Sequence, residues 1–413
     1  MPKKKTNVVE MAEPAKRESL SKRLQNLDAL FEEASKKCGV IAGRPTKSQA
    51  VMDRMTFKFF ATPIAAVNEA LGGGLAVGRN ILISGDHDTG KTGFCLATIG
   101  YQMQQDPEFV ALWVESEDSL DIVKAESLYH IDLDRFYCLS TRDPDTKKQV
   151  FGAEAIGNLI MAAIRENDID ICVVNSLKML VPMAEASKNF EDDTMAVQAR
   201  FNSKFMKKAV PLCAQRNTTM VLVQHYTTNM NAGMYGNPNM IAGGKAIRYN
   251  NMVTLEFSNL TPDDSDPITK ETGKKIKIRV TKNHCVIDRN PYVNLIYYVE
   301  YGQGIEKYFS TLQQLVNRGI IDARGAWLSL HFEDGSVDPE FKWQGKQRFK
   351  EDMIANPTKF DTLVSMLDGV TGDVENMSEA EITEIEKAEK ELAEEMAKAG
   401  VDKVDTTEQG DAA

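Results

Sequence analysis

The residues that could carry chemistry begin at position 81, where the sequence reads ILISGDHDTGKTG and contains the spacing G-x-x-x-x-G-K-[ST]. Gly85 and Gly90 allow the backbone to turn so that successive N–H groups face phosphate oxygens. Lys91 would bring a positive charge to the β and γ phosphates, and the Thr92 hydroxyl would ligate Mg²⁺. An apolar helical run follows, and the positive end of such a helix attracts anions. We therefore predict an ATP and Mg²⁺ site in a phosphate loop whose members are Gly85, Asp86, His87, Asp88, Thr89, Gly90, Lys91, Thr92 and Gly93.

Two members of this phosphate loop are acidic, although the loop is expected to hold an anion. Asp86 and Asp88 should repel phosphate unless their side chains face solvent, a metal or a neighbouring subunit. The sequence leaves these three alternatives open.

Polar residues stand at the ends of three other predicted strands: Glu115 and Glu117 after residues 110–114, Asn175 after 169–174, and Gln224 at the end of 220–224. In an open α/β sheet, chemistry lies outside the carboxyl ends of the strands. A carboxylate there can orient an attacking water, and we favour Glu117 for this role over a solvated surface acid. Gln224 is placed to sense the γ phosphate. Lys91, Glu117 and Gln224 are therefore the predicted catalytic residues.

The expected metal site departs from the usual pattern at one position. Nucleoside triphosphatases commonly place an Asp at the strand end that holds the water shell of Mg²⁺, and this chain has Asn175 there. The site loses one charge, although the amide oxygen can still accept a hydrogen bond from a metal-bound water. Glu115 could supply the missing charge. The predicted metal residues are thus Thr92, Glu115 and Asn175.

The stretch that follows Gln224 reads HYTTNMNAGMYGNPNMIAGGK. It is rich in Gly and Asn, and it is too long and too polar for a simple connection. A loop of this kind is either disordered or a binding element. We expect it to respond to the nucleotide through Gln224.

Strand-like and helix-like runs alternate through the first part of the chain, which predicts an α/β fold with a mixed, mostly parallel sheet. The later strands lack intervening helices and could form an antiparallel extension. Before this core, residues 19–37 have leucines at helical spacing, Gly39 should end the helix, and a short apolar strand follows. The predicted units are an N-terminal tail with this helix and strand (1–55), an ATPase core (56–304), a small α+β domain (305–372) and an acidic tail (373–413).

Charge is distributed unevenly along the chain. The net charge is −11, and residues 373–413 hold 14 Asp and Glu against four Lys, so the other 372 residues are nearly neutral. Binding to nucleic acid must then depend on local geometry rather than on global attraction. No apolar run is long enough to span a membrane, and the six scattered cysteines fit free thiols in a reducing compartment.

Four stretches together resemble the RecA family of homologous-recombination ATPases, including its phage UvsX type. Residues 71–93 (LGGGLAVGRNILISGDHDTGKTG) resemble the entry to the family's ATP site, and WVESEDSLD at 113–121 resembles the segment with its catalytic glutamate, which falls on Glu117. Residues 224–249, with GNP at 236–238, are similar to its second DNA-binding loop. GAWLSL at 325–330 resembles part of its C-terminal domain. The resemblance covers about residues 20–370.

The resemblance implies roles for residues that the spacing alone does not assign. Tyr301 matches an aromatic residue near the adenine, and Lys282 matches one of two lysines that reach the phosphates of a neighbouring protomer. His284 stands where the family has the second lysine. The N-terminal helix and strand would dock on the adjacent protomer and build a helical filament. The implied DNA contacts are Arg200, Lys207, Tyr235, Gly243, Gly244 and Lys245.

The resulting hypothesis is a DNA-dependent ATPase that forms a filament on single-stranded DNA and pairs it with duplex DNA in recombination and repair. Its expected place is the cytoplasm, at the nucleoid or a viral replication site, without a membrane and with single-strand-binding or loader proteins as possible partners. Asn175 and His284 put the hydrolysis rate in doubt. The alternatives are a nucleotide-gated DNA-binding filament that hydrolyses little ATP, and a ring helicase with the same core.

Overall fold

The computed structural model describes residues 19–39, 41–141, 152–186, 195–228, 239–241, 244–262, 266, 268–286, 293–331 and 336–372. Within these residues, nine strands form the main sheet in the order β13-β12-β11-β10-β3-β7-β6-β4-β5. Their bounds are β3 (Asn80–Gly85), β4 (Ala111–Glu115), β5 (Phe136–Ser140), β6 (Ile171–Asn175), β7 (Thr219–Gln224), β10 (Val253–Leu260), β11 (Gly273–Asn283), β12 (Asn294–Glu300) and β13 (Gly304–Glu306).

The sheet has a parallel part and an antiparallel part. From β10 to β5 every neighbouring pair is parallel, whereas β10, β11, β12 and β13 pair antiparallel. This confirms the predicted mixed, mostly parallel α/β fold and its antiparallel extension. The sequence analysis did not identify the edge strand β5, whose residues after Phe136 are mostly exposed.

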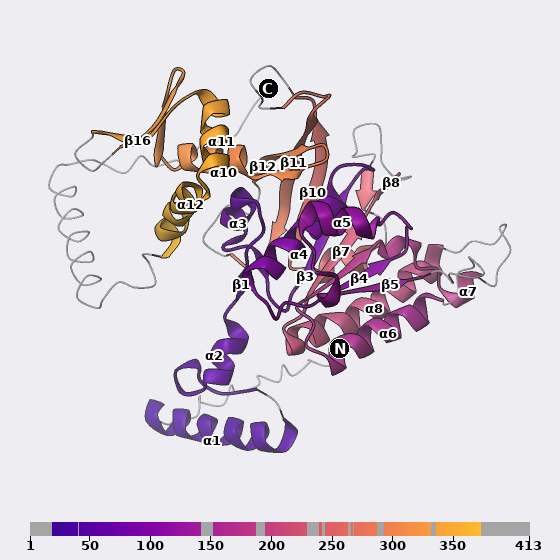
Figure 1. The fold of residues 1–413 in the computed structure, drawn as a ribbon. Coiled ribbons are helices and arrows are strands. Elements are labelled where there is room, and N and C mark those ends of the chain that lie inside the picture. The colour runs from indigo at the N-terminus through magenta and orange to yellow at the C-terminus, as the bar shows by residue number, and fades with distance from the viewer. Residues whose placement is uncertain are drawn as a thin grey trace, which may run out of the picture.

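Alternate residues of the central strands face two separate apolar layers. Ile81 and Ile83 pack into the layer covered by α3 (Ala65–Leu71), α4 (Lys91–Gln105) and α5 (Ile122–Tyr129), whereas Leu82 packs into the other. That second layer is covered by α6 (Ala153–Glu166) and α8 (Met195–Arg216). The two-residue period of a strand explains why these runs are apolar at every position. Figure 1 shows the helices on both sides of the sheet.

The N-terminal helix α1 (Leu20–Cys38) stands apart from this core together with α2 (Gln49–Met55), as Figure 1 shows. Gly39 ends α1 in the left-handed conformation, as predicted. None of the α1 residues is buried. Of the expected strand, Val40 lies outside the described residues, and Ile41 is exposed with irregular backbone.

The C-terminal unit has a three-stranded sheet of β14 (Ile321–Arg324), β15 (Trp327–His331) and β16 (Val337–Gln344). Helices α10 (Lys307–Asn317), α11 (Gly345–Ala355) and α12 (Pro357–Gly372) pack with it around an apolar cluster that includes Trp343, Phe349 and Phe360. The other elements are β1 (Phe59–Phe60), β2 (Leu75–Ala76), α7 (Met183–Ala186), β8 (Tyr226–Thr228), β9 (Asn239–Ile241), α9 (Lys245–Asn250) and three 3-10 turns at Pro45–Lys47, Leu133–Arg135 and Leu177–Met179.

Candidate nucleotide site and its link to the 225–244 segment

The phosphate loop connects β3 to α4 at the carboxyl edge of the parallel sheet. Gly85 passes so close to β10 that a Cβ atom there would lie 2.4 Å from the carbonyl oxygen of Phe257. Gly90 has φ 82°, and a Cβ would lie 2.4 Å from Cδ1 of Ile276. Both positions therefore require glycine, as the sequence motif indicates. The first turn of α4, from Lys91, presents backbone N–H groups without helical acceptors, which suits an anion.

Lys91 is buried beneath the phosphate loop, with 4% of its surface exposed. Its Nζ donates to the carbonyl oxygens of Gly85 at 3.1 Å and Asp86 at 2.5 Å. Burial lowers the pKa of Lys91, and the negative charges of Glu117 and Asp86 oppose that shift. The ammonium group is thus held by neutral carbonyl groups, where a phosphate would be a stronger partner.

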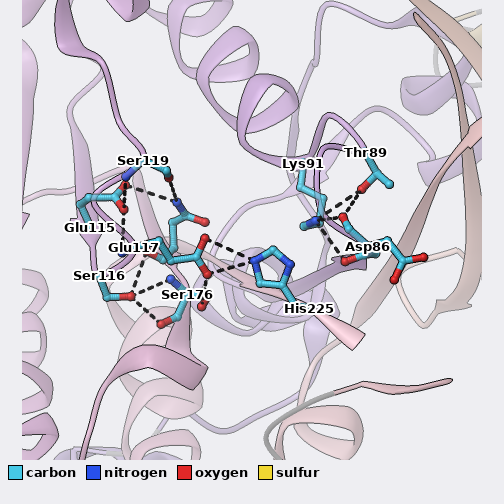
Figure 2. A network of polar contacts seen from close by, with 11 residues as sticks. Asp86, Thr89, Lys91, Glu115, Ser116, Glu117, Ser119, Ser176 and His225 are labelled. Carbon is cyan, nitrogen blue, oxygen red and sulfur yellow. Dashed lines mark hydrogen bonds and ion pairs between the residues drawn. The ribbon is translucent and has the colours of Figure 1, made fainter. Parts of the chain in front are cut away.

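Glu117 faces the phosphate loop across the end of the sheet and is held by two side chains. Ser176 donates to its Oε1 at 2.5 Å, and Nε2 of His225 lies 3.0 Å from the same oxygen. The hydrogen bond with His225, followed by that from Ser176, lowers the pKa of Glu117 against the effect of partial burial. Figure 2 shows His225 between Glu117 and the side of the site that carries Lys91.

Glu115 lies two residues earlier and has a different environment. Its Oε1 accepts the backbone N–H groups of Glu117 at 2.8 Å and Ser119 at 3.3 Å. Its Oε2 accepts Nε1 of Trp113 at 2.9 Å and Nδ2 of Asn175 at 3.3 Å. Both oxygens already bind protein donors, so the geometry favours a role in positioning the Glu117 turn over the predicted role as a metal ligand.

Two buried amides at the same edge lack complete hydrogen bonding within the described residues. Oδ1 of Asn175 has no partner there, and neither Nε2 nor Oε1 of Gln224 has one. Each side chain is at most 1% exposed. Buried polar atoms of this kind are normally satisfied by a ligand, an ion or water. Asn175 and Gln224 therefore fit a site that receives polar groups, including the water shell of Mg²⁺.

His225 was missed by the sequence analysis, which assigned the coupling role to the preceding Gln224. β7 ends at Gln224, and the His225 ring stacks on His87 of the phosphate loop with 4.3 Å between ring centroids. His225 thus contacts the loop and Glu117 together. The only signal in the sequence was its place at the start of the polar stretch after β7.

The segment between residues 225 and 244 begins and ends in paired strands. Tyr226 and Thr227 of β8 pair antiparallel with Ile241 and Met240 of β9, and Gly244, with φ 82°, is the N-cap residue of α9. Tyr235 and Gly243 lie outside the described residues, as does the side chain of Lys245. The other predicted DNA contacts, Arg200 and Lys207, are exposed on α8. Their contacts with DNA stay predictions.

Three residues assigned to the nucleotide or the protomer interface lie on the antiparallel extension. Lys282 donates to the carbonyl oxygens of Tyr249 at 3.0 Å and Asn251 at 2.5 Å, so in the single chain it caps the end of α9. Burial lowers its pKa. His284 is exposed, and Tyr301 is 51% exposed in the turn after β12. Contacts of these residues with a nucleotide stay predictions.

Comparison with known proteins decides the family. Residues 32–306 match the model of the RecA N-terminal domain. The chain belongs to the RecA family. It is 30% identical to Protein RecA of Nautilia profundicola over 340 residues, which cover 80% of this chain and 89% of the relative. Protein RecA of Desulforapulum autotrophicum is 29% identical over 305 residues, covering 73% and 80%, and that of Leptospira meyeri is 25% identical over 392, covering 93% and 94%.

Membership of the RecA family indicates a function in DNA recombination and repair, and proteins of this family bind ATP with Mg²⁺. The described residues contain no cluster of three or more His, Cys, Asp or Glu side chains that could hold a metal ion. Mg²⁺ is commonly held by one or two protein oxygens together with substrate phosphates, so it does not require such a cluster. In the same part of the chain, no helix has the length and apolar character needed to cross a membrane.

Proposed function

We propose that this chain is an ATP-dependent DNA recombinase that assembles as a helical filament on single-stranded DNA and promotes homologous pairing and strand exchange. One observation supports the proposal above the others. His225 begins the 225–244 segment, stacks on His87 of the phosphate loop and binds Glu117. A change at the phosphate loop can therefore reach both the hydrolytic residue and the segment expected to bind DNA.

Different residues of the site would bind the nucleotide, hold the metal ion and orient the attacking water. Lys91 and the amides of the phosphate loop would hold the phosphates of ATP. The Thr92 hydroxyl would hold Mg²⁺, and Oδ1 of Asn175, which has no partner among the described residues, would accept a hydrogen bond from its water. Bound Mg²⁺ neutralises phosphate charge. The lowered pKa of Glu117 keeps this carboxylate ionised, as a residue that orients an attacking water must be. Its present bonds to Ser176 and His225 would have to rearrange first.

Coupling to DNA would run through β7 and β8. The amide of Gln224, which has no hydrogen-bond partner among the described residues, and the imidazole of His225 follow one another at the strand end beside the phosphate loop. Backbone amides near Gly244 and the exposed cations Arg200 and Lys207 would then grip the sugar–phosphate backbone without reading sequence.

Assembly would use two surfaces that the single chain leaves uncovered. Leu30 of α1 is 57% exposed, and Ile41 after it is 53% exposed. At one edge of the main sheet, β5 has Tyr137 63% exposed. Edge strands readily accept an added strand from another chain. The residues around Ile41 of one copy would add to β5 of the next, with α1 packed beside them.

The proposal is tested by phosphate release and electron microscopy on the full chain. Wild-type protein should release phosphate faster with single-stranded DNA, and Glu117→Gln should reduce that rate about hundredfold. Glu126→Gln, which removes an exposed carboxylate from nearby α5, is the matched control and should keep the wild-type rate. Filaments should form with single-stranded DNA and a slowly hydrolysed ATP analogue. A protein that stays monomeric and ignores DNA at saturating ATP and Mg²⁺ would refute the proposal.

A second candidate is a nucleotide-gated filament that hydrolyses little ATP, and Asn175 is the observation that favours it. An amide in place of a carboxylate removes one negative charge from the expected Mg²⁺ site. In that case filaments would form with ATP, while DNA-stimulated phosphate release would be as low in the wild type as in Glu117→Gln. Closed rings with directional unwinding would instead indicate a helicase.

A further inference from the structure

Asp88, one of the two acidic residues of the phosphate loop, contacts side chains from two neighbouring strands. Asp88 has φ 61°, in the left-handed region, and its side chain is 82% exposed. Nζ of Lys274, from β11, lies 2.5 Å from its Oδ2 and donates to its backbone oxygen at 3.3 Å. Nδ2 of Asn259, from β10, donates to the same backbone oxygen at 3.2 Å. The antiparallel extension thus binds this residue at its carboxylate and at its carbonyl.

The ion pair between Lys274 and Asp88 matters because of the charge of the phosphate loop. Asp86 and Asp88 flank exposed His87, and Lys91 is the cation within the loop. ATP carries several negative charges, so an uncompensated carboxylate in the loop opposes its binding. Lys91 is occupied by the carbonyls of Gly85 and Asp86 rather than by either carboxylate. Lys274 supplies the cation that pairs with the carboxylate of Asp88, which Lys91 does not contact.

Lys274 also lies near a second residue assigned to the nucleotide. Its Nζ is 6.0 Å from the ring centroid of Tyr301, the aromatic residue that the family resemblance places near the adenine. The Lys274 side chain is 25% exposed, much less than that of Asp88. The ammonium therefore stands between the acidic tip of the phosphate loop and the expected base position. Two of the three alternatives that the sequence left for Asp88, a metal and a neighbouring subunit, are not needed to compensate its charge.

We propose that Lys274 is a positioning residue of the nucleotide site, which neutralises Asp88 and fastens the phosphate loop to the β10–β11 edge so that the loop accepts a triphosphate. The inference rests on the proposed ATP site and adds to it the residue that makes its acidic loop compatible with ATP. An exposed ion pair contributes little to folding stability. The effect of Lys274 therefore belongs to nucleotide binding, and the unfolding temperature should not report it.

A charge-pair cycle on the full chain tests this. Lys274→Gln should weaken binding of a fluorescent ATP analogue about tenfold, since the carboxylate of Asp88 is then uncompensated. Asp88→Asn keeps a residue type that tolerates the left-handed conformation, and it should bind the analogue more tightly than the wild type because Lys274 then adds an unpaired positive charge to the loop. The double variant Asp88→Asn/Lys274→Gln should return to within about twofold of the wild type. Lys277→Gln, on the same strand, is the matched control and should change nothing.

The number of phosphates separates compensation of Asp88 from direct contact with the base. Lys274→Gln should weaken ATP more than ADP, and ADP more than AMP, because repulsion grows with ligand charge. It should raise KM for ATP and leave kcat close to wild type. An equal loss for ATP and AMP, an equal loss in the Asp88→Asn background, or no loss at all would overturn the inference while the proposed function stands. A wild type that binds no ATP would overturn both.

Discussion

Helices α1 and α10 have the same kind of sequence pattern and opposite surroundings. Both place apolar residues at spacings of three and four, and in both a left-handed glycine follows the helix. In α10, Leu312 is 3% exposed and Leu315 is fully buried. In α1, Leu30 is 57% exposed and Phe31 is 40% exposed. Periodicity therefore establishes that a helix has an apolar face, but it does not say which chain covers that face.

The difference follows from what each helix can reach. α10 packs against α11, α12 and β14 and also contacts α3 of the core, so its apolar face is enclosed by its own chain. α1 is joined to the core through α2 and lies away from the sheet in Figure 1. An apolar helix face left open in this way commonly marks a surface for another protein. The following predictions test whether the apolar face of α10 stabilises the folded chain and whether the apolar face of α1 is needed for assembly with other copies.

The largest expected effect is on assembly. Leu27→Asp combined with Phe31→Asp places two charges on the apolar face of α1, and a charge cannot be buried there without a partner. We expect no filaments on single-stranded DNA by electron microscopy, with an unfolding temperature within about 1 °C of the wild type because α1 buries nothing in the single chain. Glu33→Gln, on the polar face of α1, should assemble normally. A large fall in unfolding temperature would show that α1 packs on its own core.

The corresponding change in α10 should affect folding. Leu315→Ala removes a fully buried side chain from the C-terminal apolar cluster and leaves a cavity. The expected loss is about 4 kcal/mol of unfolding free energy for the unit that contains α10, measured by denaturant titration. Filaments should still form below the new unfolding transition. If Leu315→Ala instead kept the stability of the wild type and lost assembly, α10 rather than α1 would be the helix that serves assembly.

The same contrast explains how much of the site the sequence could predict. The phosphate loop, the strand that precedes Glu117 and the strand that ends at Gln224 follow from local patterns, since each apolar run and each glycine acts on its immediate neighbours. The antiparallel extension was also predicted from strands without intervening helices. Family resemblance added the expectation that residues after Gln224 serve DNA binding.

What the sequence could not show depends on contacts between distant residues. Lys274 meets Asp88 only because β11 lies beside β10 at the end of the loop, and no local pattern joins positions 186 residues apart. His225 contacts Glu117 because β7 ends at Gln224, which places His225 at the carboxyl edge of the sheet. Glu115 and Glu117 look alike in the sequence. In the structure, however, Trp113 and Asn175 donate hydrogen bonds to Glu115, whereas Glu117 faces the phosphate loop.

A smaller effect is expected from a buried carboxylate at the start of α10. Glu306 is 4% exposed and accepts the N–H groups of Tyr308 at 3.2 Å and Phe309 at 2.7 Å, with Lys350 at 3.7 Å. Burial raises its pKa from 4.5 to about 7, against the opposing effects of these partners. The folded state thus holds the proton more tightly than the unfolded state does. Stability from this group is complete below pH 4.5 and is lost as pH rises through 7.

Glu306→Gln should remove this loss of stability with rising pH, because the glutamine side chain does not ionise. Relative to the variant, the wild type should lose about 2.5 kcal/mol of unfolding free energy between pH 5 and pH 8, and denaturant titrations of both proteins across this range measure it. Glu32→Gln in α1 is the matched control, because Glu32 is fully exposed and its pKa is lowered by Lys36. Its profile should follow the wild type over the same pH range. Parallel profiles for Glu306→Gln and wild type would mean that Glu306 is already ionised in the folded chain at pH 5.

The smallest effect compares the two glycines that end these helices. Gly39 after α1 has φ 63° and Gly319 after α10 has φ 71°, and neither has any atom within 4 Å of the position of a Cβ. Alanine at either site therefore meets the same backbone strain, about 1 kcal/mol, and no steric clash. In Gly319→Ala this strain should lower the unfolding free energy of the C-terminal unit by that amount. In Gly39→Ala it should only increase amide hydrogen exchange in the last turn of α1, because global unfolding of the free chain does not depend on a helix that buries nothing. If Gly39→Ala also lowers global stability in the unassembled protein, α1 must pack on the core of its own chain beyond the ion pairs of Asp28 with Arg44 and Lys47, and the two helices differ less than their exposure indicates.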